Sequence, residues 1–397
     1  MIKLTFEINI FVIQPLKVNS FSKPILMDNT LRYQIALSMI PGVGGITAKK
    51  LISYCGGVEA LFREKKHALL KIPGIGNVLG DLVTGFKDFD RVDKEMAFIE
   101  KSGIKAMFYL DSNYPARLKH CEDGPILLFY KGIADLNNPK SIAIVGTRSI
   151  TEYGKEKCDE LIEGLKKHDP LIVSGLAYGV DARAHKAALD HQLATVGVLG
   201  HGLDRIYPPL HKQLAIRMLD EGGGLLSDFN SGTIPSRENF PRRNRIIAGL
   251  VDALIVVEAA KSGGALITAN IASSYSRDVF AVPGRTSDIY SQGCNHLIKT
   301  LKATLVENAE DVEYAMNWQI QNDKAKPVQQ SLFVELSSDE QTIIDLIKEN
   351  GESSFDYLVN KTQLGFSKTS SLLLNLELKG ALSPLPGKVF KLSKAYF

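Results

Sequence analysis

Residues 141–154 read SIAIVGTRSITEYG, an apolar stretch of strand length that ends at a glycine turn and leads into a segment of helical character. Further apolar stretches of this length follow along the chain, namely LIVSG (171–175), TVGVLG (195–200), ALIVVEA (253–259) and DVFAVPG (278–284). Amphipathic stretches such as KEKCDELIEGLKKH (155–168) lie between them. Apolar strands separated by helices predict a parallel sheet that helices cover on both faces, which is a Rossmann-like doubly wound α/β fold.

The region before this α/β pattern has helical periodicity with two similar interruptions. PGVG (41–44) and PGIG (73–76) each separate two short helical stretches, as is typical of the helix-hairpin-helix motif. The glycines permit a tight turn and leave amides free at the next helix start, where phosphate oxygens can bind. A helical scaffold that contacts no DNA is the alternative. We expect a SAM-like helical domain at 27–104 and the Rossmann-like domain at 105–316.

The two ends of the chain differ from these domains. Residues 317–334 are polar and predict a linker, and 335–397 predict three helices and a β-hairpin, a winged-helix domain. Its seven Lys or Arg against eight Asp or Glu give a net charge of about −1, which disfavours duplex DNA and favours a protein contact. Glu7 and Asn9 interrupt the apolar start of the chain and no small-residue cleavage site follows. We interpret residues 1–26 as a disordered extension or an upstream start.

The composition is that of an ordinary globular protein, with 45% hydrophobic and 23% charged residues and a formal net charge of +3. Such a small charge requires any nucleic-acid site to be locally basic. The four cysteines form no CxxC pair, which argues against zinc sites and disulfides and suits a reducing cytoplasm. No apolar run reaches the ~18–20 residues that span a membrane. We expect a cytoplasmic protein with no membrane contact, no metal, no cofactor and no catalytic residue.

The glycine turns after the strands are the expected site, because ligands of such sheets bind at the carboxyl ends of the strands. The turn at 146–148 offers close backbone approach, a hydroxyl and a guanidinium that matches phosphate. Segment 234–249 holds four arginines against one acid, interleaved with an aromatic ring, as single-stranded nucleic acid requires. The turn at 262–264 places free amides at a helix start. The predicted DNA-binding residues are Gly146, Thr147, Arg148, Ser174, Gly175, Phe240, Arg242, Arg243, Asn244, Arg245, Ser262, Gly263 and Gly264.

Two groups of residues at this edge of the sheet have simpler explanations. The arginines of 234–249 can instead pair with acids elsewhere in the fold. Asp181 and His185 lie four residues apart on a predicted helix and could act as an acid–base pair. We interpret them as a helix-start carboxylate and a hydrogen-bonded structural histidine.

Taken together, these segments closely resemble the DNA-processing protein A (DprA, or Smf) family. SIAIVGTRSITEYG, SGLAYGVDARAH, GHGLDRIYP, PSRENFPRRNRIIAGL, SGGALITA and VPG occur here in that family's order, over about 141–284, and the flanking regions extend the likeness from Met27 to the end. The resemblance implies a recombination mediator that binds and protects incoming single-stranded DNA, displaces single-strand-binding protein and loads the RecA recombinase during natural transformation or recombination. It also implies a homodimer formed through the Rossmann domain. Tyr178 stands where some members carry a lysine, so that cation is absent here.

A nucleotide-processing enzyme is the main alternative. The same Rossmann subtype resembles that of lysine-decarboxylase-like phosphoribohydrolases, whose PGGxGTxxE segment supplies a glutamate. The corresponding stretch here, SGGALITANIA, has no acid from Ser262 to Ser274, and the nearest carboxylate is Glu258, before the turn. A receptor for a small nucleotide would need only the phosphate-binding glycines. An ATP-driven enzyme is disfavoured because the sequence has no GxxxxGK motif.

Overall fold

The computed structural model describes residues 29–318, 336–385 and 388–393. The chain divides into two compact units, Met1–Gln319 and Ile320–Phe397. The predicted extension at 1–26 and most of the predicted linker at 317–334 lie outside the described residues. The boundary proposed between 104 and 105 stays a prediction. Within the described residues, no helix combines the length and the hydropathy that a membrane crossing requires.

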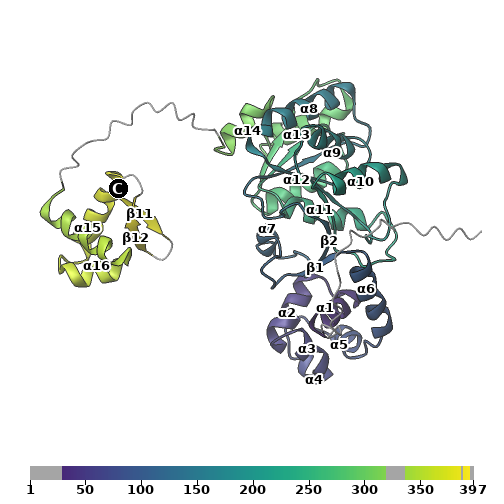
Figure 1. Cartoon of the computed structure of the whole chain (residues 1–397), viewed down its shortest axis with the longest axis horizontal. Coiled ribbons are helices and arrows are strands. Elements are labelled where there is room, and N and C mark those ends of the chain that lie inside the picture. The colour runs from purple at the N-terminus through teal and green to yellow at the C-terminus, as the bar shows by residue number, and fades with distance from the viewer. Residues whose placement is uncertain (1–28, 319–335, 386–387, 394–397) are drawn as a thin grey trace, which may run out of the picture. The chain divides into compact units, whose positions relative to one another are not determined.

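A nine-stranded sheet forms the centre of the first unit, in the order β1-β2-β6-β5-β4-β3-β7-β8-β9 (Figure 1). Strands β3 to β9 pair in parallel, whereas β2 is antiparallel to β6 and β1 is antiparallel to β2. The Rossmann-like prediction is therefore confirmed, with an antiparallel edge added. The strands are β1 (Lys105–Phe108), β2 (Leu127–Gly132), β3 (Ser141–Val145), β4 (Leu171–Ser174), β5 (Thr195–Val198), β6 (Gly224–Ser227), β7 (Ala253–Val256), β8 (Asp278–Ala281) and β9 (Thr304–Leu305).

Helices cover both faces of this sheet, as the apolar strands require. Ile142 and Ile144 of β3 pack with α8, α9 and α14, and the alternating Ala143 and Val145 pack with α11, α12 and α13. The helices are α7 (Ala116–Lys119), α8 (Glu152–Leu165), α9 (Val180–Asp190), α10 (Lys212–Asp220), α11 (Asn239–Gly249), α12 (Gly264–Ser274), α13 (Gln292–Lys299) and α14 (Ala309–Ala315), with the 3-10 turns η1 (Lys166–His168), η2 (Pro209–His211) and η3 (Ile289–Ser291).

The strand order reverses beside β3, and this reversal locates the site. From β3 the chain moves through β4, β5 and β6 on one side and returns to form β7, β8 and β9 on the other. The loops after β3 and β7 therefore diverge at the carboxyl edge of the sheet. Such a switch point leaves a crevice in which ligands of doubly wound sheets bind.

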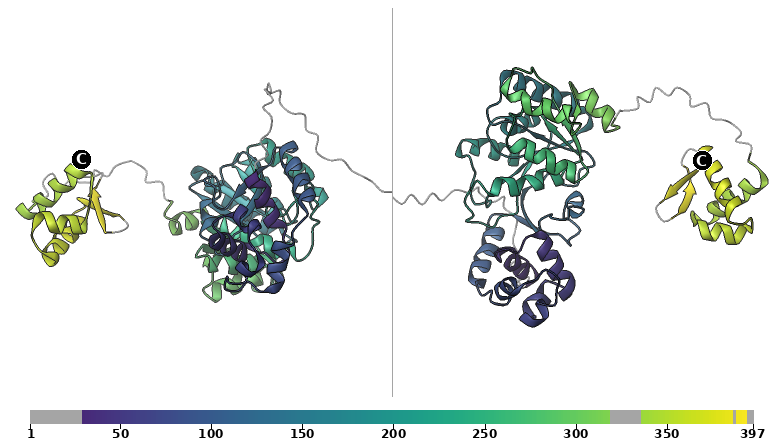
Figure 2. Two further views of the ribbon diagram at one scale, coloured as in Figure 1. Left: turned by 90° about the horizontal axis from the view of Figure 1, so that it is seen from below. Right: turned by 180° about the vertical axis from the view of Figure 1, so that it is seen from behind.

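In the described part of the chain, six helices precede the sheet and pack beside its antiparallel edge. They share an apolar core with Phe108 of β1 and Leu127 and Phe129 of β2, and the views in Figures 1 and 2 place them at this end. Gly42 and Gly74 have φ of 77° and 83°, so both predicted hairpin turns need glycine. Gly45 lies against the backbone of Asp123 and Gly124, where a Cβ would collide. The helices are α1 (Asn29–Met39), α2 (Gly45–Cys55), α3 (Val58–Arg63), α4 (Lys66–Leu69), α5 (Asn77–Thr84) and α6 (Phe89–Lys101).

The second unit has its own apolar core and confirms the predicted winged helix. It consists of α15 (Ser338–Asn350), β10 (Glu352–Ser354), α16 (Phe355–Thr362), α17 (Phe366–Leu378), β11 (Leu382–Leu385) and β12 (Val389–Leu392). Lys368 of α17 pairs with Asp339 (2.7 Å), and Lys379, just after α17, pairs with Glu340 (2.9 Å). These pairs neutralise the two cations of the supposed recognition helix. A protein contact remains our prediction for this unit.

Candidate nucleic-acid interface

The turn after β3 is held rigidly between two neighbouring elements. Thr147 donates its backbone N–H to the carbonyl oxygen of Glu258 (2.8 Å), and its own carbonyl accepts from Val180 N at the start of α9 (3.1 Å). A Cβ on Gly146 would collide with Val180, so this position requires glycine. The clamped turn projects the exposed side chain of Arg148 outward.

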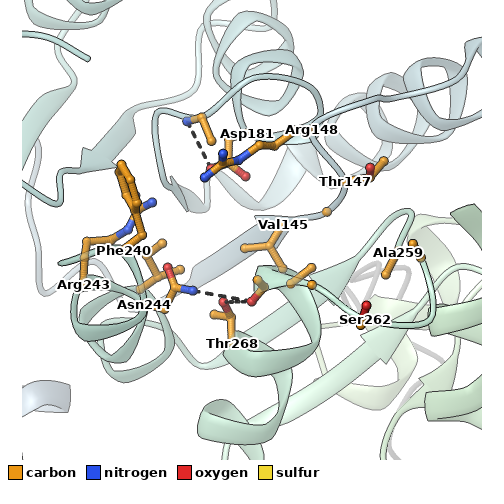
Figure 3. Close-up of a pocket in the computed structure, with 17 residues that line it drawn as sticks. Val145, Thr147, Arg148, Asp181, Phe240, Arg243, Asn244, Ala259, Ser262 and Thr268 are labelled. Carbon is orange, nitrogen blue, oxygen red and sulfur yellow. Dashed lines mark hydrogen bonds between the residues drawn. The ribbon is translucent and has the colours of Figure 1, made fainter. Parts of the chain in front are cut away.

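A cavity of about 310 Å³ opens at the switch point, between this turn, the first turns of α11 and the start of α12 (Figure 3). Nine of the thirteen predicted residues line it, although they come from three separate stretches of sequence. They are Gly146, Thr147, Arg148, Phe240, Arg243, Asn244, Ser262, Gly263 and Gly264. The fold therefore gathers most of the predicted set around one space.

The mouth of the cavity, together with a smaller pocket beside it that Tyr207 lines, combines a cation with aromatic rings. The guanidinium carbon of Arg148 lies 5.6 Å from the ring centroid of Phe240, within the range of a cation–π contact. The ring of Tyr207 lies 6.0 Å from that of Phe240, tilted by 32°, and Tyr207 is 44% exposed. Tyr207 was not in the predicted set. A charge next to accessible flat faces can hold a phosphate and stack a base.

A second cation, Arg243, is buried in the wall of the cavity. One Nη donates to the carbonyl oxygen of Val198, while Nε has no hydrogen-bond partner within the described residues. Burial lowers the pKa of this guanidinium and raises the pKa of the nearby Asp181 carboxyl, although the Arg243 charge opposes the latter shift. A Cβ on Gly175 would collide with both side chains, so this glycine makes room for them. A buried cation with an unused donor is suited to an anionic ligand.

The start of α12 forms the opposite wall of the cavity. Ser262, Gly263 and Gly264 are exposed, and the first turn of this 11-residue helix presents free backbone amides. The amide of Asn244 donates to the carbonyl oxygen of Gly264 (3.4 Å), and the hydroxyl of Thr268 donates to the same oxygen (2.9 Å), as Figure 3 shows. The bond from Asn244 joins the start of α12 to α11, whereas the bond from Thr268 lies within α12.

The comparisons with known proteins agree with this arrangement. Residues 105–317 match the model of DNA recombination-mediator protein A, and residues 327–388 match the DprA winged helix domain. The chain belongs to the DNA recombination-mediator protein A (DprA) family. It is 43% identical over 203 residues to the DNA processing protein DprA of Streptococcus pneumoniae, a match that spans 51% of this chain and 71% of the relative. It is 36% identical over 295 residues to the protein Smf of Escherichia coli, spanning 71% of this chain and 76% of the relative.

The solved structure of the Streptococcus pneumoniae DprA is also similar to this DprA-family chain. The two superpose with a TM-score of 0.61 at 34% sequence identity, over 71% of this chain and 95% of the other. The family resemblance and the Rossmann-like fold expected from the sequence are both confirmed.

Four predicted residues of this DprA-family chain do not line the cavity. The hydroxyl of Ser174 is buried and donates to the carbonyl oxygen of Ile144 (2.6 Å). Gly175 contributes by its missing side chain, which leaves room for Arg243 and Asp181. Arg245 pairs with Asp228 (2.6 Å), which is the alternative that the sequence left open for these arginines. The side chain of Arg242 lies against the ring of Phe229 and not in the cavity.

The potential acid–base groups of this DprA-family chain all make hydrogen bonds within the fold, and one of them, Asp181, also lines the cavity. Nε2 of the buried His185 donates to the carbonyl oxygen of Gly175 (2.5 Å), and burial lowers the pKa of His185 to about 4. The Glu258 carboxylate accepts hydrogen bonds from the backbone N–H (2.9 Å) and hydroxyl (2.5 Å) of Thr151, the N-cap residue of α8. Asp181 accepts from Ala177 N (3.3 Å). Among the described residues, no cluster of three His, Cys, Asp or Glu side chains could hold a metal ion.

Proposed function

We propose that this chain is a recombination mediator that binds single-stranded DNA in the switch-point cavity. The observation that carries the proposal is the convergence of two arginines and an open helix N-terminus on one cavity with aromatic rings at its mouth. Arg148 and Arg243 bind phosphate oxygens, and the amides of 262–264 bind a neighbouring phosphate. Phe240 and Tyr207 stack on bases. The description of the DprA family as recombination mediators supports this assignment.

The arrangement of the site favours a single strand over a duplex. The aromatic rings lie beside the cations at the same mouth, so a ligand must present phosphates and unstacked bases to one small region. A single strand does so at little cost, whereas a duplex keeps the faces of its bases stacked inside the helix. Stacking and phosphate contacts do not distinguish base edges, so binding has little sequence preference.

As a mediator, the protein protects incoming single-stranded DNA, displaces single-strand-binding protein and loads the RecA recombinase in natural transformation or recombination. This part of the proposal depends on membership of the family. It needs no catalytic residue, because differential binding of the partners transfers the strand. The four cysteines are all free, which fits the reducing cytoplasm in which we propose that it works.

We further propose a homodimer through the free edge of the Rossmann sheet. The sheet ends at β9 in the described part of the chain. Leu301, just before this strand, is 93% exposed, and Leu305 within it is 42% exposed. An edge strand with exposed leucines in it and just before it is a surface that a second copy can cover.

Equilibrium binding tests the function. A labelled single strand of about 20 nucleotides and a duplex of equal length are titrated with the full chain across a salt series. The single strand is expected to bind more tightly, and its affinity is expected to fall steeply with salt. Tighter duplex binding, or affinity that salt leaves unchanged, would contradict the proposal.

A further inference from the structure

The first turn of α11 separates the cavity from a second depression. Arg242 and Arg243 are consecutive and therefore point about 100° apart around the helix. Arg243 enters the cavity, whereas the guanidinium carbon of Arg242 lies 5.3 Å from the ring centroid of Phe229 on the far side. There it borders a groove of about 510 Å³ between the end of α1, the start of α6 and the loop 228–233. We call this space the helical-side groove.

The walls of the helical-side groove are held in place by buried polar contacts. Glu95 of α6 is 1% exposed, accepts from the backbone N–H of Ser231 (2.8 Å), and pairs with Arg91 (2.9 Å). Arg91 in turn donates to the carbonyl oxygen of Ser231. Asp228 pairs with Arg245 (2.6 Å). A groove whose walls are already ordered costs little conformational entropy when a ligand enters.

The helical-side groove is lined by the carboxylates Asp88 and Asp228 and by Arg91 as well as by apolar side chains, and Arg91 is already paired with Glu95, so the groove complements bases and sugars more than phosphates. Met39, Phe86 and Phe229 provide apolar and aromatic surface. Asp228 lines the groove, its side chain is 5% exposed, and its Oδ1 has no hydrogen-bond partner in the described residues. That oxygen is itself buried, so this carboxylate holds the wall through its pair with Arg245 rather than offering an accessible contact to a ligand. The cation at the rim, Arg242, is the group suited to a phosphate.

We propose that a single strand held in the switch-point cavity crosses the first turn of α11 at Arg242 and continues into the helical-side groove. The helices before the sheet thereby form part of the DNA-binding surface, through α1 and α6 rather than through the glycine hairpins. This inference rests on the proposed function, since the cavity must bind DNA for the path to continue from it. Continuity carries it: Arg243 lines the cavity, and its neighbour on α11, Arg242, lines the groove.

A length series with a matched pair of variants tests the path. Met39→Glu places a carboxylate in the groove, and Met39→Gln has nearly the same size without the charge. Oligothymidylates of about 5 and about 20 nucleotides serve as probes, since the shorter one fills only the cavity. Met39→Glu is expected to bind the longer strand roughly three- to tenfold more weakly than Met39→Gln, with equal affinity for the shorter strand. Thermal melts of both variants confirm folding.

The outcomes separate this inference from the proposed function. Arg242→Ala is expected to weaken only the longer strand, whereas Arg148→Ala weakens both. Equal affinities of the two Met39 variants for the longer strand would overturn the path while leaving the cavity in place. Wild-type protein that binds neither strand, or an Arg148→Ala variant that binds both normally, would overturn the proposed function and the path with it.

Discussion

Replacing Arg148 with alanine should weaken single-stranded DNA binding without weakening the fold. Arg148 is exposed, and among the described residues its side chain contacts the ring of Phe240. Its charge also attracts the buried Asp181 carboxyl and repels the buried Arg243 guanidinium. Its removal leaves no buried hydrogen-bonding group unsatisfied, and the effects on Asp181 and Arg243 have opposite signs, so the free energy of unfolding should change by less than about 0.5 kcal/mol. Without its charge-assisted hydrogen bond to a phosphate, binding should weaken by ~1–3 kcal/mol. That range corresponds to a roughly 5- to 150-fold increase in Kd.

Fluorescence anisotropy with a labelled oligothymidylate measures this effect across a salt series. The slope of log K against log salt should become shallower by about 0.7 for each phosphate that the variant no longer neutralises. Arg148→Lys keeps the charge but loses the planar fork, so it should retain the slope and recover part of the affinity. Arg63→Ala is the matched control, because Arg63 is 76% exposed on α3 and lines neither the cavity nor the helical-side groove. Wild-type affinity and slope in a well-folded Arg148→Ala protein would refute the reasoning.

Three further predictions concern stability, chemistry and assembly. The free energy of unfolding should fall as pH decreases from 6.5 toward 4, and His185 should contribute at most roughly 1.4 kcal/mol per pH unit to this fall. In this range His185 takes up a proton in the unfolded chain, whereas its burial keeps it neutral in the folded protein. Urea unfolding of His185→Gln should show a shallower dependence between pH 6.5 and 5, and an unchanged dependence would rule His185 out as the cause. Nucleoside monophosphates, ATP and single-stranded DNA should release no base, phosphate or shortened strand above a buffer control; turnover that Asp181→Asn or Glu258→Gln abolishes would favour the hydrolase alternative. Leu301→Asp should shift the sedimentation coefficient from a dimer to a monomer, and an unchanged dimer would place the interface elsewhere.

Five of the parallel strands, β3, β4, β5, β7 and β8, were predictable because they are buried on both faces and are therefore almost continuously apolar, whereas β6 and the exposed two-residue strand β9 were not singled out. Stretches such as 141–146 and 253–259 carry this signal directly. Strands β1 and β2 were not among the strands singled out from the sequence. Both belong to the antiparallel part of the sheet, with β1 at the edge and β2 between β1 and β6. The pairing of β2 with β6 joins residues almost 100 positions apart, which no local pattern encodes.

The place of the candidate cavity in the fold was predictable for a related reason. All parallel strands end at one edge, so separate glycine turns had to gather there, and nine predicted residues do line the cavity. The directions of individual side chains were not predictable. Arg242, Arg243 and Arg245 share one helix, yet they face a groove, the cavity and an acid respectively, because each successive position rotates by about 100°. Tyr207 lies in a loop without periodicity, so its position beside Phe240 depends on tertiary packing.

Arginine-selective labelling tests the central claim, that single-stranded DNA occupies the switch-point cavity, most directly. The full chain is treated with phenylglyoxal with and without saturating oligothymidylate, and the modified arginines are mapped by mass spectrometry. Arg148 should be labelled in the free protein and protected in the complex, while Arg63 should be labelled equally in both. Labelling of Arg148 that saturating DNA leaves unchanged would contradict the account.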